Sequence, residues 1–146
     1  NVEQLVDEGT GHLVAALGPI NGHIGYSSFA TTQRFLETNS EVVQRFTSGF
    51  YNAQKWLAQN DAQAVAALVT PLFPEIDTRL ISAAIARYKD QDTWAKDPLF
   101  REDGFDMLQD VLAQAHLINS PQSYARIVQP DFARKAMGIV PSDQIS

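Results

Sequence analysis

The 146-residue sequence contains no cysteine, which excludes disulfides, a thiolate nucleophile and cysteine-ligated zinc. It is also poor in basic residues: 11 Lys and Arg stand against 17 Asp and Glu, giving a formal net charge of -6. A negative surface repels phosphate backbones and anionic membranes. We therefore expect no nucleic acid among the partners of this protein.

Long apolar runs are absent as well. No stretch approaches the roughly 18 apolar residues that cross a bilayer, and the first residues lack the basic segment and apolar stretch of a signal peptide. Hydrophobic residues make up 45% of the sequence and charged residues 19%, which is typical of a globular protein and not of a disordered or fibrous one. The length suits one domain.

Two segments near the start of the sequence have the composition of β-strands. The apolar run 12–17 lies between glycines, and the segment 24–30 is rich in β-branched and aromatic residues. A loop rich in turn residues separates them. Two strands this short are marginally stable alone, so we expect further chain or another subunit to complete their sheet.

From residue 31 onward, apolar residues recur at helical spacing. The strongest stripe runs through residues 40–59, and Thr38 with Glu41 has the spacing of a capping box at its start. A free-standing helical bundle over residues 31–138 is the alternative, but it gives the two extended segments no role. Weaker stripes predict helices at the N-terminus, over 64–69, 80–88 and 102–116, and after Pro130.

None of the usual catalytic motifs is complete. His12, His23 and His116 are too far apart in sequence to form a zinc-binding pair on one helix, and we interpret His116 as a structural residue at a helix C-terminus. The segment 25–29 has the first Gly and the Ser of a nucleophile elbow, but Phe29 occupies the position of the closing Gly. We expect no catalytic residue, no metal site and no cofactor.

The loop after the first predicted strand is the best position for a ligand. Gly18 and Pro19 directly follow that strand. Ligands of open α/β sheets bind just beyond the carboxyl ends of the strands. We therefore expect ligand contacts in this loop.

Three longer segments carry a resemblance to a known family. Residues 8–19 (EGTGHLVAALGP), 25–36 (GYSSFATTQRFL) and 39–46 (NSEVVQRF) resemble the solute-binding proteins of ABC importers. Within these, they resemble the nitrate, sulfonate and taurine group, which includes binding proteins for thiamine pyrimidine precursors. Shorter similar segments follow in the same order, so that the resemblance covers about residues 2–136; they are 53–57, 86–89, Trp94 and 105–110.

The resemblance is to the C-terminal half of that family and implies an α/β fold. The chain would be the C-terminal part of a two-lobed periplasmic-binding-protein fold, mostly helical in this part, with two short strands. Residues 1–24 would form the end of the second lobe and the hinge, and residues 25–138 the crossover strand and the helices of the first lobe. Residues 139–146 would form a tail.

The resemblance also implies binding without catalysis. The protein would capture a small solute, such as a sulfonate, taurine, nitrate or a thiamine pyrimidine precursor, and deliver it to an ABC permease in the membrane. The matching ligand-binding positions are Gly18, Pro19, Tyr26, Ser27 and Ser28, although Tyr26 could instead pack in the sheet and Ser27 could bond to backbone.

A family member of this kind works outside the cytoplasm. The expected location is the periplasm or, with a lipid anchor, the extracellular face. Its further partner would be the missing N-terminal half of the same protein, or a second copy that completes the sheet.

Two other functions remain open at this point. Some relatives of the family build the thiamine pyrimidine with a histidine and iron, and only His23 is placed for such an enzyme. The chain could also be an interaction domain whose incomplete sheet is completed by a partner chain.

Overall fold

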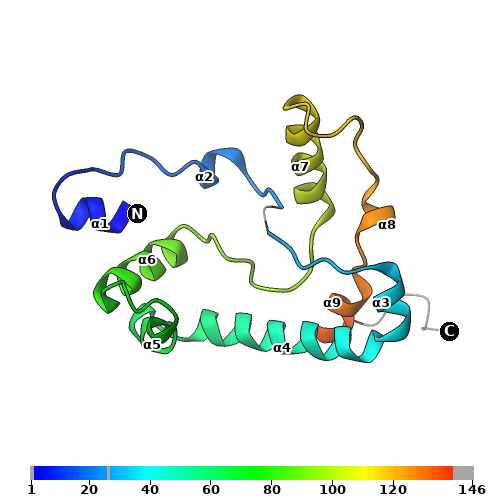
Figure 1. Ribbon diagram of the computed structural model, residues 1–146, viewed down its shortest axis with the longest axis horizontal. Helices are drawn as coiled ribbons and strands as arrows, with labels where there is room; N and C mark the ends of the chain where they lie inside the picture. The colour runs from blue at the N-terminus through cyan, green and yellow to red at the C-terminus, as the bar shows by residue number, and fades with distance from the viewer. Residues whose placement is uncertain (1, 26, 140–146) are drawn as a thin grey trace. The chain divides into compact units, whose positions relative to one another are not determined.

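The computed structural model describes residues 2–25 and 27–139, and for residues 19 and 21 it describes the backbone only. The described residues form helices joined by loops (Figure 1). The helices are α1 (Val2–Asp7), α2 (Gly18–Asn21), α3 (Gln33–Thr38), α4 (Ser40–Gln59), α5 (Ala62–Val69), the 3-10 helix η1 (Thr70–Leu72), α6 (Thr78–Asp90), α7 (Glu102–Gln114), α8 (Tyr124–Ile127) and α9 (Asp131–Ala136).

The prediction of an α/β fold with two short strands is wrong, because the described part of the chain contains no β-strand and is helical. Residues 12–17 form a loop in which Val14 is 95% exposed. A strand needs a neighbour to accept its backbone hydrogen bonds, and the described residues supply none. In the second segment, the backbone N–H of Gly25 donates instead to the Gly104 carbonyl of α7, at 2.9 Å.

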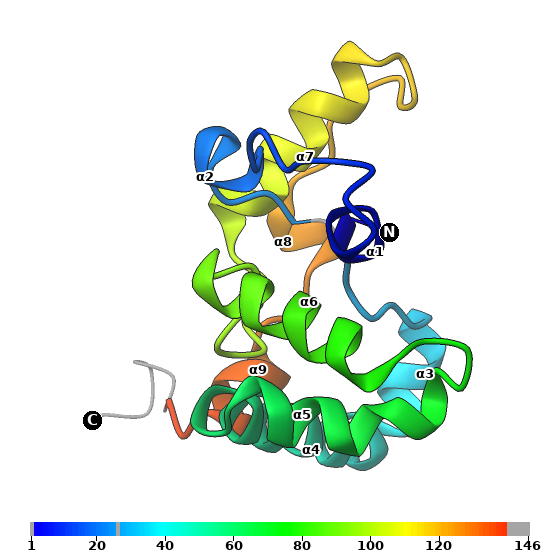
Figure 2. The same ribbon diagram turned by 90° about the vertical axis from the view of Figure 1, so that its left-hand side faces the viewer.

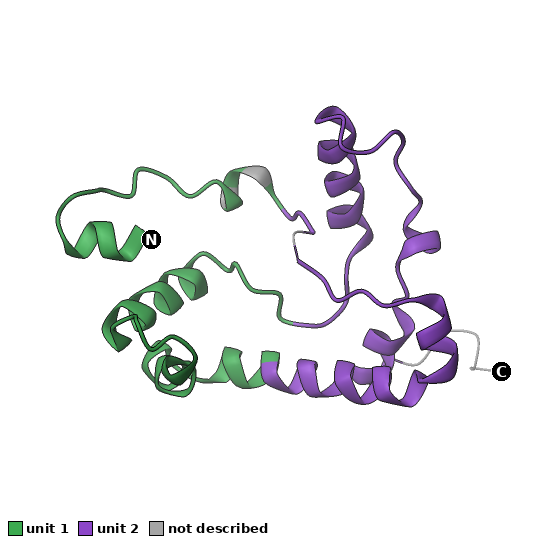
Figure 3. Ribbon diagram, in the orientation of Figure 1, with its two compact units in different colours: residues 1–22, 54–96 green, residues 23–53, 97–146 purple. Residues whose placement is uncertain are grey.

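The structure divides into two compact units (Figure 3). The first comprises residues 1–22 and 54–96, and the second comprises residues 23–53 and 97–146. Helix α4 contributes its last residues to the first unit and the rest to the second. Within the described residues, none of the helices combines the length and the hydrophobicity that a transmembrane span requires.

The first unit is built on the pairing of α5 with α6, which lie against each other (Figure 2). Their buried residues form a small core: Val65 and Ala66 from α5, Ile81 and Ile85 from α6. Both helices have side-chain N-caps, because Asp61 accepts from the Ala64 N–H at 2.8 Å and Asp77 accepts from the Arg79 N–H at 2.7 Å. Partly buried hydrophobic residues surround this core: Leu57, Ala62, Val69, Ile76 and Trp94.

An ion pair attaches α1 to α6. The guanidinium of Arg87 donates through Nε to Oε1 of Glu3 and through Nη2 to Oε2 at 3.1 Å. Glu3 is buried, whereas Arg87 is partly exposed. The hydrogen bonds from Arg87 lower the pKa of Glu3 below its ordinary value of 4.5. The pair therefore favours the folded state wherever Glu3 is ionised.

We expect this contribution to stability to depend on pH. Because folding lowers the pKa of Glu3, the contribution is complete above pH 4.5 and is lost as the pH falls through the lower folded value. The substitution Glu3→Gln should reduce the free energy of unfolding at pH 7 by about 1 kcal/mol. Urea titrations at pH 7 and pH 3 measure both effects. Glu75→Gln, at an exposed position, is the control; equal losses in the two variants would contradict the expectation.

The second unit contains an aromatic cluster at α7 and α8. Phe105 is buried and makes edge-to-face contacts with Phe100, at 6.1 Å between ring centroids, and with Tyr124, at 5.8 Å. The Tyr124 hydroxyl donates to the Phe100 carbonyl, and burial raises the pKa of Tyr124.

A hydrogen bond also joins α4 to α9 in this unit. Nε2 of Gln44 in α4 donates to the carbonyl of Phe132 in α9, at 3.1 Å.

The predicted capping box at the start of α4 does not form. Thr38 is instead the last residue of α3, and its hydroxyl donates to the Arg34 carbonyl at 2.8 Å. The backbone of Asn39 begins the next helix, because its carbonyl accepts from the Val42 and Val43 N–H groups. The long helix itself is confirmed, since α4 spans the region in which the apolar stripe predicts it.

Helix α7 ends in a Schellman motif. The N–H of Leu117 donates to the Leu112 carbonyl at 2.9 Å, and the N–H of His116 donates to the Ala113 carbonyl at 3.0 Å. His116 occupies the left-handed position with φ of 57°, and its side chain is exposed. This conformation costs energy for any residue that has a Cβ atom.

Replacing His116 by glycine should therefore raise the free energy of unfolding by about 1 kcal/mol. The urea midpoint and the melting temperature measure the gain. His12→Gly is a matched control, because His12 lies in a loop and its φ is not positive. A gain of the same size from both substitutions would show that the left-handed backbone is not its cause.

Candidate functional site

The residues predicted to bind ligand lie in both units. Gly18 and Pro19 begin α2 in the first unit, and Ser27 and Ser28 are exposed in the loop before α3 in the second. Tyr26 lies outside the described residues. A proline in the first turn of a helix needs no N–H partner, which explains why the Gly-Pro pair starts a helix here. The ligand-binding role of these five residues stays a prediction.

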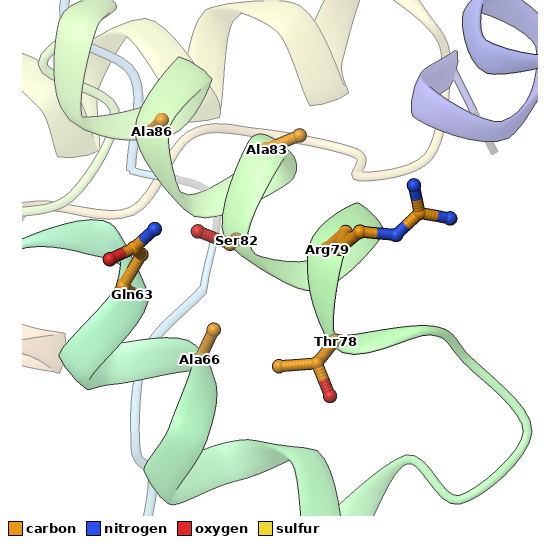
Figure 4. A pocket seen from close by; sticks show the side chains of 7 residues that line it. All are labelled: Gln63, Ala66, Thr78, Arg79, Ser82, Ala83 and Ala86. Carbon is orange, nitrogen blue, oxygen red and sulfur yellow. The ribbon is translucent and has the colours of Figure 1, made fainter.

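A groove of about 530 Å³ lies between α5 and α6 in the first unit (Figure 4). Small side chains on the facing helices, such as Ala66 and Ala83, leave this space open. On α6 its residues lie on one face, because they recur at steps of three and four. The lining consists of Gln63, Ala66, Thr78, Arg79, Ser82, Ala83 and Ala86.

The polar groups of this groove suit hydrogen bonding. Ser82 and Gln63 extend into the space between the helices, whereas Arg79 points outward (Figure 4). Arg79 is exposed and donates from Nε to Oδ1 of Asp77 at 3.2 Å, so a nearby carboxylate offsets its charge. Hydrogen bonds from the backbone and then the side chain of Arg79 lower the pKa of Asp77. The groove therefore presents an amide and hydroxyl groups beside alanine side chains.

The sequence interpretation missed this groove. Its signal was present in α6, where Arg79, Ser82, Ala83 and Ala86 share one face opposite the core residues Ile81 and Ile85. Small and polar residues on one face of a helix are usually simply solvated. Only the tertiary structure adds Gln63 and Ala66 of α5 to these residues and so forms a groove.

A second groove, of about 330 Å³, lies between α4 and α9 in the second unit. The hydrogen bond from Gln44 to the Phe132 carbonyl spans it. Arg45 and Glu41, which line this groove, form an ion pair at 3.5 Å. Both side chains are highly exposed, so the pair contributes little to stability. The lining residues are Ser40, Glu41, Gln44, Arg45, Phe132 and Lys135.

The structure gives no grouping of metal ligands within its described residues. No three side chains of His, Cys, Asp or Glu there lie close enough to hold a metal ion. His12 belongs to the first unit, and His23 and His116 to the second. His116 stands at the C-terminal end of α7 in an exposed position.

Exposed aromatic rings gather on α4. Phe29, from the loop before α3, meets Phe46 and Phe50 edge-to-face, with ring centroids at 4.8 Å and 5.1 Å. Val42 lies one turn before Phe46 and is also exposed. We call Phe29, Val42, Phe46 and Phe50 the aromatic face. Contiguous apolar residues on a surface often mark an interaction site.

Comparison with known proteins gives one informative similarity. The chain is 29% identical over 128 residues to "Putative binding protein YtlA" of Bacillus subtilis (strain 168). The match covers 88% of this chain but only 38% of that protein, so the chain spans less than two-fifths of the relative. No family model matches the sequence, and no solved structure matches it. The similarity supports a binding role in general.

Proposed function

We propose that this chain is part of the solute-binding component of an ABC importer. The observation that carries the proposal is the similarity to a binding protein along 88% of the chain. The resemblance of residues 8–19, 25–36 and 39–46 to the nitrate, sulfonate and taurine group narrows the class of solute. The solute is then a sulfonate, taurine, nitrate or a thiamine pyrimidine precursor, and the receiving partner is a membrane permease.

The exposed positions of the predicted contacts support this proposal. Gly18, Ser27 and Ser28 are all accessible, and a Cβ atom added at Gly18 would meet nothing within 4 Å. Backbone N–H groups and serine hydroxyls are donors that suit sulfonate or nitrate oxygens. The protein acts without catalysis in this proposal, and it works in the periplasm or at the outer surface of the membrane.

The surface of the chain supports a role within a larger assembly. Among the hydrophobic side chains that the structure describes, only Phe105 and Ala133 are buried in the second unit. Many others are exposed in both units. A folded domain of this length normally buries most of its apolar surface. We therefore propose that further polypeptide of the same binding protein covers part of this chain.

Thermal shift of the native gene product tests the binding role. Taurine, ethanesulfonate, nitrate and an aminopyrimidine are each titrated, and one class should raise the melting temperature by several degrees at about 100 times Kd. Ser27→Ala and Ser28→Ala should reduce this shift, whereas Ser120→Ala, an exposed position in the loop after α7, should leave it unchanged. If no compound in the panel shifts the melting temperature, the proposed solute class is wrong.

A further inference from the structure

The apolar stripe of α4 is largely exposed within the second unit. Val42, Phe46 and Phe50 are 55%, 50% and 37% exposed. Polar residues on other faces of the helix are less exposed: Thr47 donates its hydroxyl to the Val43 carbonyl, and Gln44 donates to the Phe132 carbonyl. An amphipathic helix of a free domain normally turns its apolar stripe to the core. In α4 the apolar stripe is instead exposed, and the polar residues Gln44 and Thr47 are the less exposed ones.

The exposed rings are already ordered against one another. Phe46 and Phe50 are nearly parallel, at 9° and 6.4 Å between centroids, and Phe29 meets both at 81°. Such contacts restrict the three side chains before any partner arrives. A partner that covers them therefore loses little side-chain entropy. The three rings therefore form a preorganised contact surface.

We infer that the aromatic face is the surface on which the remainder of a longer binding protein docks. This inference rests on the proposed function. The relative supplies the occupant, because 62% of it lies outside the region that this chain matches. A polypeptide of that size can present a folded apolar surface to Phe29, Phe46 and Phe50.

A second copy of the chain fits the aromatic face less well. Each copy carries a net charge of -6, so association of two copies brings like charges together. The two charged residues at the start of α4, Glu41 and Arg45, pair with each other within one chain. They therefore leave little charge to attract a second copy.

Labelling of a single introduced thiol tests the inference. The sequence has no cysteine, so Phe46→Cys creates one reactive site within these residues. The variant is made both in the isolated 146-residue chain and in the native gene product, and maleimide labelling of the peptide that carries residue 46 is followed by mass spectrometry. We expect labelling at least tenfold slower in the native gene product than in the isolated chain. Phe50→Cys is a second test position.

Glu41→Cys is the matched control on the same helix. Position 41 is five residues from position 46, which places it about 140° around the helix, and Glu41 is highly exposed. It should be labelled at the same rate in both proteins. Equal labelling of position 46 in both proteins would overturn the inference.

Two further outcomes would also overturn it. Protection of position 46 in the isolated chain that grows with protein concentration would assign the face to a second copy. A native gene that encodes these 146 residues alone would leave no occupant of the proposed kind. The labelling needs no solute, so failure of the thermal-shift panel and failure of the docking inference are observed separately.

Discussion

Replacing Ile85 by alanine is expected to lower the free energy of unfolding of the first unit by about 2–4 kcal/mol. Ile85 is 6% exposed and belongs to a core of only four buried residues between α5 and α6. The substitution removes three carbon atoms and leaves a cavity in that core. The measurement is urea unfolding followed by far-ultraviolet circular dichroism.

Two companion variants make this experiment specific. Leu68→Ala also removes three carbon atoms, but Leu68 on α5 is 64% exposed, so the loss should stay below about 0.5 kcal/mol. Ile85→Val should fall between the two, at about 1 kcal/mol. If Leu68→Ala costs as much as Ile85→Ala, α5 and α6 do not form the core described above.

Replacing Gly25 by alanine should cost about 1–3 kcal/mol in the second unit, because the new methyl group overlaps a neighbouring ring. An added Cβ atom would lie 2.3 Å from two ring carbons of Phe100 and 3.4 Å from the Gly104 carbonyl oxygen. Movement of the Phe100 ring would disturb its edge-to-face contact with Phe105. Movement of the backbone would instead lengthen the hydrogen bond from Gly25 to Gly104.

A double-mutant cycle with Phe100→Ala separates these causes. In the Phe100→Ala background the ring is absent, so Gly25→Ala should cost less than about 0.5 kcal/mol. Gly18→Ala serves as the control, because nothing lies within 4 Å of the added atom and the φ of Gly18 is not positive. An unchanged cost of Gly25→Ala without the Phe100 ring would refute the steric explanation.

The helices could be predicted from the sequence where an apolar stripe was long. The periodic stripe in residues 40–59 corresponds to α4, and the stripes over 80–88 and 102–116 correspond to most of α6 and α7. The strands could not be predicted correctly, because composition alone does not show whether a hydrogen-bonding neighbour exists. Residues 12–17 have the composition of a buried strand, yet Val14 lies in an exposed loop.

The candidate site, too, could be predicted from the sequence only in part. The segments that resemble solute-binding proteins could be recognised from residue order, and the similarity to a binding protein agrees with a binding role. The groove between α5 and α6 could not be predicted from residue order, because its lining joins Gln63 and Ala66 to residues of α6 that follow a dozen or more positions later. Sequence spacing within one helix says nothing about which other helix faces it.

The sequence by itself determined the acidic charge, the absence of cysteine chemistry and the positions of the main helices, because these depend on residue identity and on local periodicity. The tertiary structure alone decided that the apolar stripe of α4 is exposed and that Gly25 packs against α7. Periodicity establishes that a helix has an apolar side, but only the surrounding chain determines whether that side is covered.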